Sequence, residues 1–154
     1  MTASDLSGTT CIVTGGGRGL GRAMVLALAG AGANVTAAMH IADDIESEAA
    51  GLPGKVKAMV ADIRDPMQCA EIISDTVATF GGIDTLVNNA GVGMLLVSES
   101  FNRTPPKFWD VQPEIWAQII ETNVNGGFQM AREAVPHMLE KGWGRIVNVT
   151  TSIQ

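Results

Sequence analysis

Short apolar, β-branched runs alternate with longer amphipathic segments along most of the chain. The short runs predict buried strands over 9–14, 34–39, 55–61, 83–88 and 145–150. The longer segments predict helices over 19–31, 43–50, 66–80 and 113–139. The last of these helices is expected to bend near Gly126-Gly127 or Pro136. Residues 90–112 form a long connection with little periodicity, and loops of this length in compact domains are often functional.

The order of these elements indicates the fold class. Strands that alternate with helices, and that are apolar along nearly their whole length, predict a parallel sheet with helices on both faces. Right-handed crossovers then give a doubly wound α/β sheet of Rossmann type, with strand order 3-2-1-4-5. The switch point lies between the first and fourth strands, and a ligand is expected at the carboxyl ends of the strands there. The 154 residues suffice for one domain with a substantial core.

Charge and composition exclude several function classes. The formal net charge of −6 argues against a nucleic-acid partner. No apolar run approaches the roughly 20 residues that a bilayer requires, and residues 1–10 show no secretion signal. We therefore expect a cytoplasmic protein without a membrane partner, with Cys11 and Cys69 reduced, buried and inert. We expect no metal site.

A glycine-rich segment, residues 14–21 (TGGGRGLG), follows the first strand. Glycine at this place lets the chain turn sharply, lets a pyrophosphate touch the backbone and lets the next helix pack close to the sheet. The helix N-terminus offers free N–H groups and the positive end of its dipole, and Arg18 could add a charged contact. The spacing is neither G-x-G-x-x-G nor that of a P-loop. A glycine-rich turn without a ligand is the alternative.

The T-G-x-x-x-G-x-G spacing resembles the short-chain dehydrogenase/reductase family, and other motifs match that family in order. Asn-Asn-Ala-Gly at 88–91 follows the fourth strand, and Asp62-Ile63 follows the third. Asn123, within Glu-Thr-Asn-Val-Asn at 121–125, matches the helix asparagine of the family's catalytic set. Residues 144–149 (GRIVNV) match its fifth strand. The resemblance extends over the whole chain.

The resemblance implies a set of cofactor-binding residues at the strand ends. These are Gly15, Gly17, Arg18, Gly19, Leu20, Gly21, Met39, His40, Asp62, Ile63, Asn89, Ala90 and Gly91. The glycine-rich turn would line the pyrophosphate, and residues 89–91 would lie beside the ribose on the nicotinamide side. Asp62 would accept a hydrogen bond from the adenine amino group, and Ile63 would flank the ring. Alternatively, Asp62 is a cap or turn residue, since Asp65 and Pro66 open the next helix.

The end of the second strand bears on the choice between NAD and NADP. An acidic residue about 20 positions beyond the glycines selects NAD by binding the ribose 2′-OH. Met39 and His40 stand there instead, so no carboxylate repels a 2′-phosphate, and His40 and Arg18 could face one. This favours NADP over NAD. His40 is otherwise an exposed loop residue, and Asp43 and Asp44, farther along, could shift the balance to NAD.

The resemblance also implies a chemistry: hydride transfer between the nicotinamide and a carbonyl or secondary alcohol. In the family a tyrosine with a nearby lysine handles the proton, a serine binds the substrate oxygen and the helix asparagine supports a water. Asn123 matches that asparagine, and Thr151 or Ser152 falls at the serine position. The chain contains no tyrosine, and the Tyr-x-x-x-Lys motif would come after Gln154.

The sequence therefore predicts the cofactor-binding part of an NAD(P)-dependent oxidoreductase, without the C-terminal strands of the family and inactive by itself. A non-catalytic dinucleotide-binding or dimerisation module is the alternative. The full-length protein is expected to act on a small carbonyl or alcohol and to form a homo-oligomer. Apolar residues of the long connection either line a substrate pocket or pack against further protein: Met94, Leu95, Leu96, Phe101, Phe108 and Trp109.

Overall fold

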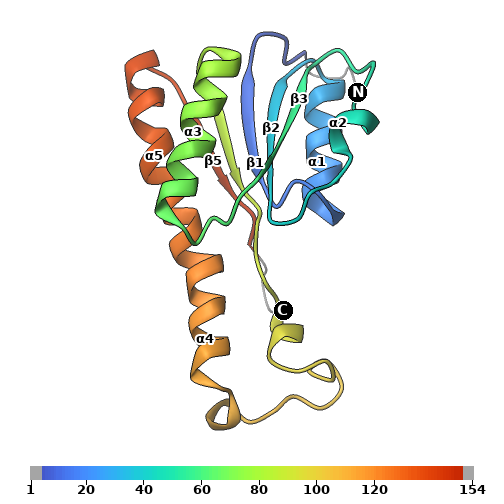
Figure 1. The fold of residues 1–154 in the computed structure, drawn as a ribbon, viewed down its shortest axis with the longest axis vertical. Coiled ribbons are helices and arrows are strands. Elements are labelled where there is room, and N and C mark those ends of the chain that lie inside the picture. Colours follow the sequence, from blue (N-terminus) through green and yellow to red (C-terminus); the bar gives the residue numbers. More distant parts are fainter. Residues whose placement is uncertain (1–4, 151–154) are drawn as a thin grey trace.

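The computed structural model describes residues 5–150, so Thr151 and Ser152 lie outside the described residues. It contains a five-stranded parallel sheet of order β3-β2-β1-β4-β5, which confirms the predicted fold class and strand order (Figure 1). The strands are β1 (Thr10–Thr14), β2 (Asn34–Met39), β3 (Val56–Val60), β4 (Thr85–Asn88) and β5 (Arg145–Asn148). The helices are α1 (Gly19–Gly30), α2 (Ile45–Glu48), α3 (Pro66–Phe80), α4 (Pro113–Ile120) and α5 (Gly127–Lys141).

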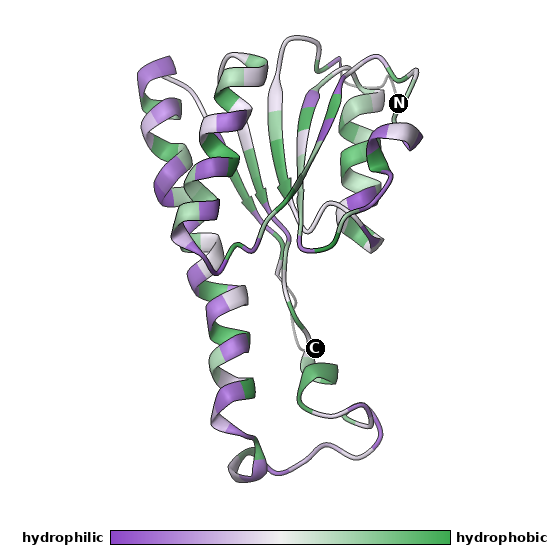
Figure 2. Cartoon of the chain, in the orientation of Figure 1, coloured by the Kyte–Doolittle hydropathy of each residue, from purple (hydrophilic) through white to green (hydrophobic). Residues whose placement is uncertain are grey.

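Two hydrophobic layers hold the helices on opposite faces of the sheet. Cys11 and Val13 of β1 pack with Val25 of α1, whereas Ile12 packs with Ile72 of α3 and with α5. This is the alternation expected of a strand that is covered on both faces. Hydrophobic residues accordingly concentrate on the strands and on the helix sides that face them (Figure 2). Every residue of β1 is buried, and each large apolar side chain buried in this way contributes roughly 1.5–3 kcal/mol.

The two borders of the sheet differ. At the β3 border, the N–H of Ala58 donates to Glu46 Oε1 of α2 at 2.6 Å. At the β5 border, every strand residue is exposed, and Ile146 and Val147 are 37% and 40% exposed. Strand β5 therefore presents apolar side chains and an unshielded edge within residues 5–150, whereas α2 shields the middle of β3.

Helix α3 begins and ends as its sequence predicts. The Asp65 side chain accepts a hydrogen bond from the N–H of Met67 at 2.9 Å, and Pro66 occupies the first helical position. Gly81 ends the helix in the left-handed conformation, with φ +87°. No helix within residues 5–150 is both long and apolar enough to cross a bilayer.

The helix predicted over 113–139 is present, and it extends to Lys141. It consists of α4, a π-helical segment (Glu121–Gly126) and α5, which together form a continuous rod. The wide π-helical turn coincides with a close approach to the loop after β3, because a Cβ at Gly126 would lie 2.6 Å from Ile63 Cδ1. The π-helical segment ends at Gly126, one of the positions named for the bend, and Pro136 lies inside α5.

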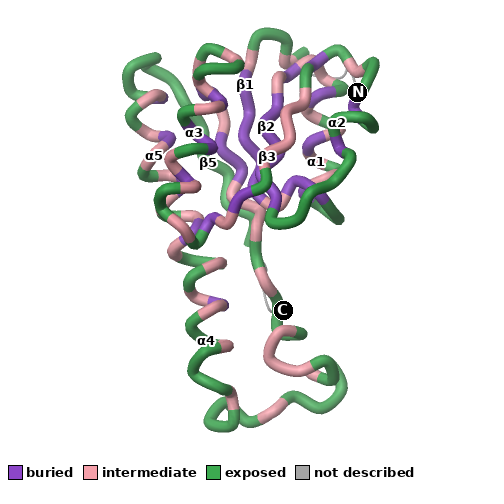
Figure 3. Tube along the Cα trace, viewed as in Figure 1, coloured by how far each residue is buried: buried purple, intermediate pink, exposed green. Residues whose placement is uncertain are grey.

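The other differences concern element ends. The helix predicted over 43–50 is only the short α2, with Asp44 at its N-cap, and both Asp43 and Asp44 form ion pairs with Arg22 of α1. Strands β4 and β5 are shorter than predicted, because β4 begins only at Thr85 and β5 already ends at Asn148. The long connection contains short 3₁₀ turns at Met94–Leu96 and Phe108–Asp110. Together with α4 it projects beyond the carboxyl ends of the strands and is largely exposed (Figures 1 and 3).

Candidate functional site

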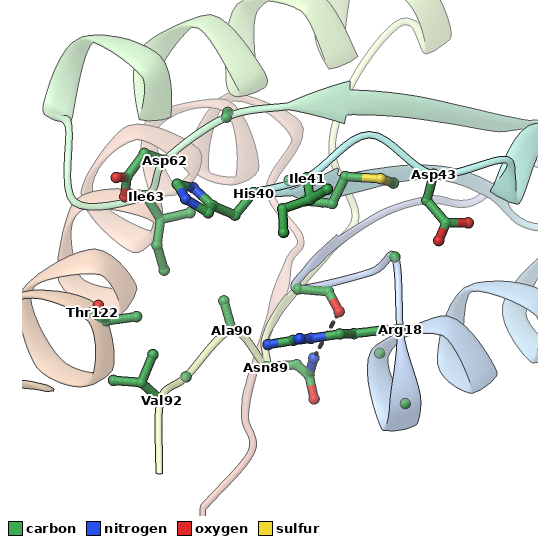
Figure 4. A pocket seen from close by; sticks show the side chains of 18 of the residues that line it. Arg18, His40, Ile41, Asp43, Asp62, Ile63, Asn89, Ala90, Val92 and Thr122 are labelled. Carbon is green, nitrogen blue, oxygen red and sulfur yellow. Dashed lines mark hydrogen bonds between the residues drawn. The ribbon is translucent and has the colours of Figure 1, made fainter. Parts of the chain in front are cut away.

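A cavity of about 570 Å³ lies at the carboxyl ends of β1 to β4, at the predicted switch point. It is lined by every residue of the predicted cofactor-binding set (Figure 4). Other lining residues were not predicted as site residues: Ala38, Ile41, Ala42, Asp43, Ala61, Arg64, Val92, Gln118 and Thr122. Segments that are far apart in the sequence therefore converge on one cavity.

The glycine-rich turn forms one wall of the cavity and requires glycine for space as well as for conformation. Gly15 and Gly19 have φ of +68° and +53°, a region that other residues rarely adopt. A Cβ at Gly21 would overlap the carbonyl oxygen of Gly15 and lie 2.6 Å from Asn89 Nδ2. The turn therefore holds the start of α1 tightly against the ends of β1 and β4.

The start of α1 has backbone N–H groups without a hydrogen-bond acceptor in the helix. Its first backbone hydrogen bond runs from the N–H of Arg22 to the carbonyl of Arg18, at 3.2 Å, and no side chain caps this end. The N–H groups of residues 19–21 precede that bond, so they remain for an outside acceptor. A helix N-terminus of this kind suits an anion, and the space that the glycines leave suits a diphosphate.

A set of hydrogen bonds joins the end of β1 to the end of β4. The hydroxyl oxygen of Thr14 accepts hydrogen bonds from the N–H groups of Asn89 and Ala90, each at 3.0 Å, and the hydroxyl donates to the Val87 carbonyl at 3.3 Å. The Asn89 amide in turn donates to the carbonyls of Thr14 at 2.9 Å and Gly15 at 3.4 Å. These bonds fix the 89–91 wall relative to the glycine-rich turn, so Asn89 is a positioning residue.

Asp62 is both a turn residue and part of the cavity wall. Its carboxylate accepts a hydrogen bond from the N–H of Arg64 at 2.9 Å and binds the Arg64 guanidinium through Nε at 2.9 Å. The hydrogen bonds from the Arg64 side chain hold the pKa of Asp62 below its usual value. Asp62, Ile63 and His40 lie along one side of the cavity in Figure 4. The two interpretations of Asp62 are therefore compatible.

A second carboxylate, that of Asp43, lies beside the glycine-rich turn. Arg22 of α1 donates to the Gly17 carbonyl at 3.2 Å and forms ion pairs with Asp43, Asp44 and Glu48. The hydrogen bond from Arg22 keeps the pKa of Asp43 below its ordinary value. The Asp43 Cβ would lie only 3.5 Å from a Cβ built at Gly17. Asp43 thus places a carboxylate near the end of β2, where the sequence has Met39 and His40.

Asn123 lies in the π-helical segment and holds the loop that follows β4. Its side-chain oxygen accepts a hydrogen bond from the N–H of Val92 at 2.8 Å, and its amide donates to the Val92 carbonyl at 2.9 Å. It also borders a second cavity of about 780 Å³ together with Asn88 and Thr150. The side chain thus positions the loop, a role that no sequence motif predicts.

The two cysteines do not line the cavity. Cys11 and Cys69 are unpaired and buried, as predicted, and desolvation by burial raises the pKa of each thiol to about 11. Within residues 5–150, no cluster of three or more His, Cys, Asp or Glu side chains is arranged to hold a metal ion.

A parallel sheet of this strand order, with a glycine-rich turn opening a helix at its switch point, defines a Rossmann-type α/β protein. Residues 9–154 match the family model described as short chain dehydrogenase. The chain therefore belongs to the short-chain dehydrogenase/reductase family, which the sequence motifs predicted.

Named relatives agree with this assignment. The chain is 35% identical to the 3-oxoacyl-[acyl-carrier-protein] reductase FabG of Thermotoga maritima, over 96% of this chain and 57% of the relative. It is 36% identical to a D-beta-hydroxybutyrate dehydrogenase of Rhizobium meliloti, over 93% of this chain and 54% of that protein. The chain thus spans about half the length of these curated relatives.

Among solved structures, a metagenomic short-chain oxidoreductase in complex with NADP has a TM-score of 0.86 at 27% identity. The match covers 97% of this chain and 65% of that one. A putative short-chain alcohol dehydrogenase from Sinorhizobium meliloti has a TM-score of 0.81 at 32% identity, over 94% of this chain and 54% of its own.

Proposed function

We propose that this chain is the nicotinamide-dinucleotide-binding part of a short-chain oxidoreductase that uses NAD or NADP. The observation that carries the proposal is the convergence of all the predicted cofactor-binding residues on one cavity at the start of α1. The solved relative in complex with NADP supports the same class of cofactor.

The residues of the cavity suggest how the nucleotide lies. The free N–H groups of the first turn of α1 would bind its diphosphate, helped by the positive end of the helix dipole. Asp62 and Ile63 would take the adenine, and residues 89–91 would lie beside the ribose on the nicotinamide side. In the sequence, Met39 and His40 favour NADP over NAD, whereas the surroundings of Asp43, described below, favour NAD, and NAD is the preference that we propose.

The chemistry proposed for the full-length protein is hydride exchange between the bound nicotinamide and a small carbonyl or secondary alcohol. Asn123, Thr151 and Ser152 are the residues of this chain proposed for the catalytic set. The chain contains no tyrosine to act as the proton donor, so we expect no turnover from these 154 residues by themselves. This lack also favours the alternative of a non-catalytic binding module. A cytoplasmic location and a homo-oligomeric full-length protein remain predictions.

Titration of the chain with NADH, followed by the fluorescence of the bound nucleotide, tests the proposal. Gly21→Ala is expected to abolish saturable binding, because its Cβ has no room between Gly15 and Asn89. Gly30→Ala is the matched control, since nothing lies within 4 Å of a Cβ there and the residue is also in α1. If the wild-type chain is folded and binds neither NADH nor NADPH, the proposal is wrong.

A further inference from the structure

The adenosine ribose must pass Asp43 if the nucleotide lies as proposed above. Its diphosphate would sit at the glycine-rich turn and its adenine at Asp62 and Ile63. The ribose joins these two groups, so it lies between the turn and the end of β2. Asp43 lines the cavity at this place, beside Gly17, and Figure 4 shows its side chain at the end of the cavity nearest the turn.

The Asp43 carboxylate is fixed in place. Arg22 pairs with it while donating to the Gly17 carbonyl, so one guanidinium ties the carboxylate to the turn. A carboxylate that is oriented in advance binds a hydroxyl donor at a lower cost in side-chain entropy than a mobile one does. The same ion pair keeps the pKa of Asp43 below its ordinary value, so the group is charged at neutral pH.

The local charge disfavours another anion. Arg22 carries one positive charge against the carboxylates of Asp43, Asp44 and Glu48, which leaves an excess of two negative charges around it. Arg22 is therefore not a free partner for a 2′-phosphate. Arg18 is exposed, and in Figure 4 its side chain extends toward the side of the cavity where Asn89 and Ala90 are drawn, away from Asp43. In the nucleotide position proposed above, it would contact the diphosphate.

We propose that Asp43, held by Arg22, binds the hydroxyls of the adenosine ribose and disfavours a 2′-phosphate, so that the chain prefers NAD(H) to NADP(H). This inference rests on the proposed nucleotide-binding function. Asp43 lies in a loop, four positions beyond the end of β2. The inference gives it the role of binding the ribose hydroxyls, which the apolar side chain of Met39 cannot perform. A phosphate monoester dianion about 5 Å from an exposed carboxylate is disfavoured by about tenfold in affinity, equivalent to about 1.4 kcal/mol.

The test compares dissociation constants for NADH and NADPH, measured with the full chain by fluorescence titration and by calorimetry. The wild-type chain is expected to bind NADH at least about tenfold more tightly than NADPH. Asp43→Asn is expected to move this ratio toward NADPH by about tenfold, since it removes the repelling charge and releases part of Arg22. Asp43→Glu keeps the charge and is expected to retain the preference for NADH.

Asp44→Asn is the matched control. It removes the same charge from a neighbouring partner of Arg22, but Asp44 is 80% exposed and does not line the cavity. We expect it to change the ratio by less than about threefold, because exposed charges are well screened. A wild-type preference for NADPH, an unchanged ratio in Asp43→Asn, or an equal effect of Asp44→Asn would overturn the inference and leave nucleotide binding standing. A folded chain that binds neither nucleotide would refute the proposed function itself.

Discussion

Thr14→Val isolates the hydrogen bonds that join the end of β1 to the end of β4. The substitution keeps the shape of a side chain that is only 1% exposed, but it removes the oxygen that accepts from the N–H groups of Asn89 and Ala90. A buried N–H without an acceptor costs about 1–3 kcal/mol. Asn89 and Ala90 are half-buried, so water can replace part of the loss. We therefore expect the free energy of unfolding to fall by about 2–3 kcal/mol.

The same substitution is expected to weaken NADH binding by about tenfold, because the 89–91 wall is no longer fixed relative to the glycine-rich turn. Urea unfolding and NADH titration measure the two effects on the same sample. Thr36→Val is the control: Thr36 is buried in β2, and its hydroxyl forms one hydrogen bond with the Thr76 hydroxyl at 2.8 Å, away from the cavity. It is expected to cost about 1 kcal/mol of stability without changing NADH affinity. Equal effects of the two substitutions on affinity would refute the reasoning.

Further predictions concern groups outside the cavity wall. Asp84→Ala is expected to cost about 1–3 kcal/mol in urea unfolding, because its buried carboxylate accepts the N–H that opens β1 and pairs with the last residue of α5. Asp75→Ala, which breaks a half-exposed ion pair, is expected to cost less than about 1 kcal/mol. Asn123→Ala is expected to speed hydrogen exchange in the loop after β4 and leave exchange in α3 unchanged. Native Cys11 and Cys69 are expected to resist thiol reagents at pH 8, where a pKa of about 11 leaves both protonated, and to react once urea unfolds the chain; immediate native labelling would contradict their burial.

The parts of the site that the sequence predicts are those encoded within a few residues. Local sequence is enough to recognise three of them: the glycine-rich turn, the cap formed by Asp65 and Pro66, and the Asn-Asn-Ala-Gly segment. The strand order also follows, because right-handed crossovers leave few arrangements for apolar strands of this kind.

The parts that the sequence leaves open depend on contacts between distant segments. The ion pair between Arg22 and Asp43 joins the first helix to the loop after β2, and no motif marks it. The contact of Gly126 with Ile63, which accompanies the π-helical segment, is equally invisible in a linear pattern. The bonds from Asn123 to Val92 arise only when that segment passes the loop after β4.

The unequal borders of the sheet limit how molecules of this chain could stack strand against strand. Addition of a strand from another molecule at β3 is hindered, because Glu46 already accepts the hydrogen bond from the N–H of Ala58. Within residues 5–150, β5 is therefore the border at which a strand of a second molecule could add. Two molecules joined there would turn their shielded β3 borders outward, which is the geometry of a closed pair and not of a fibre.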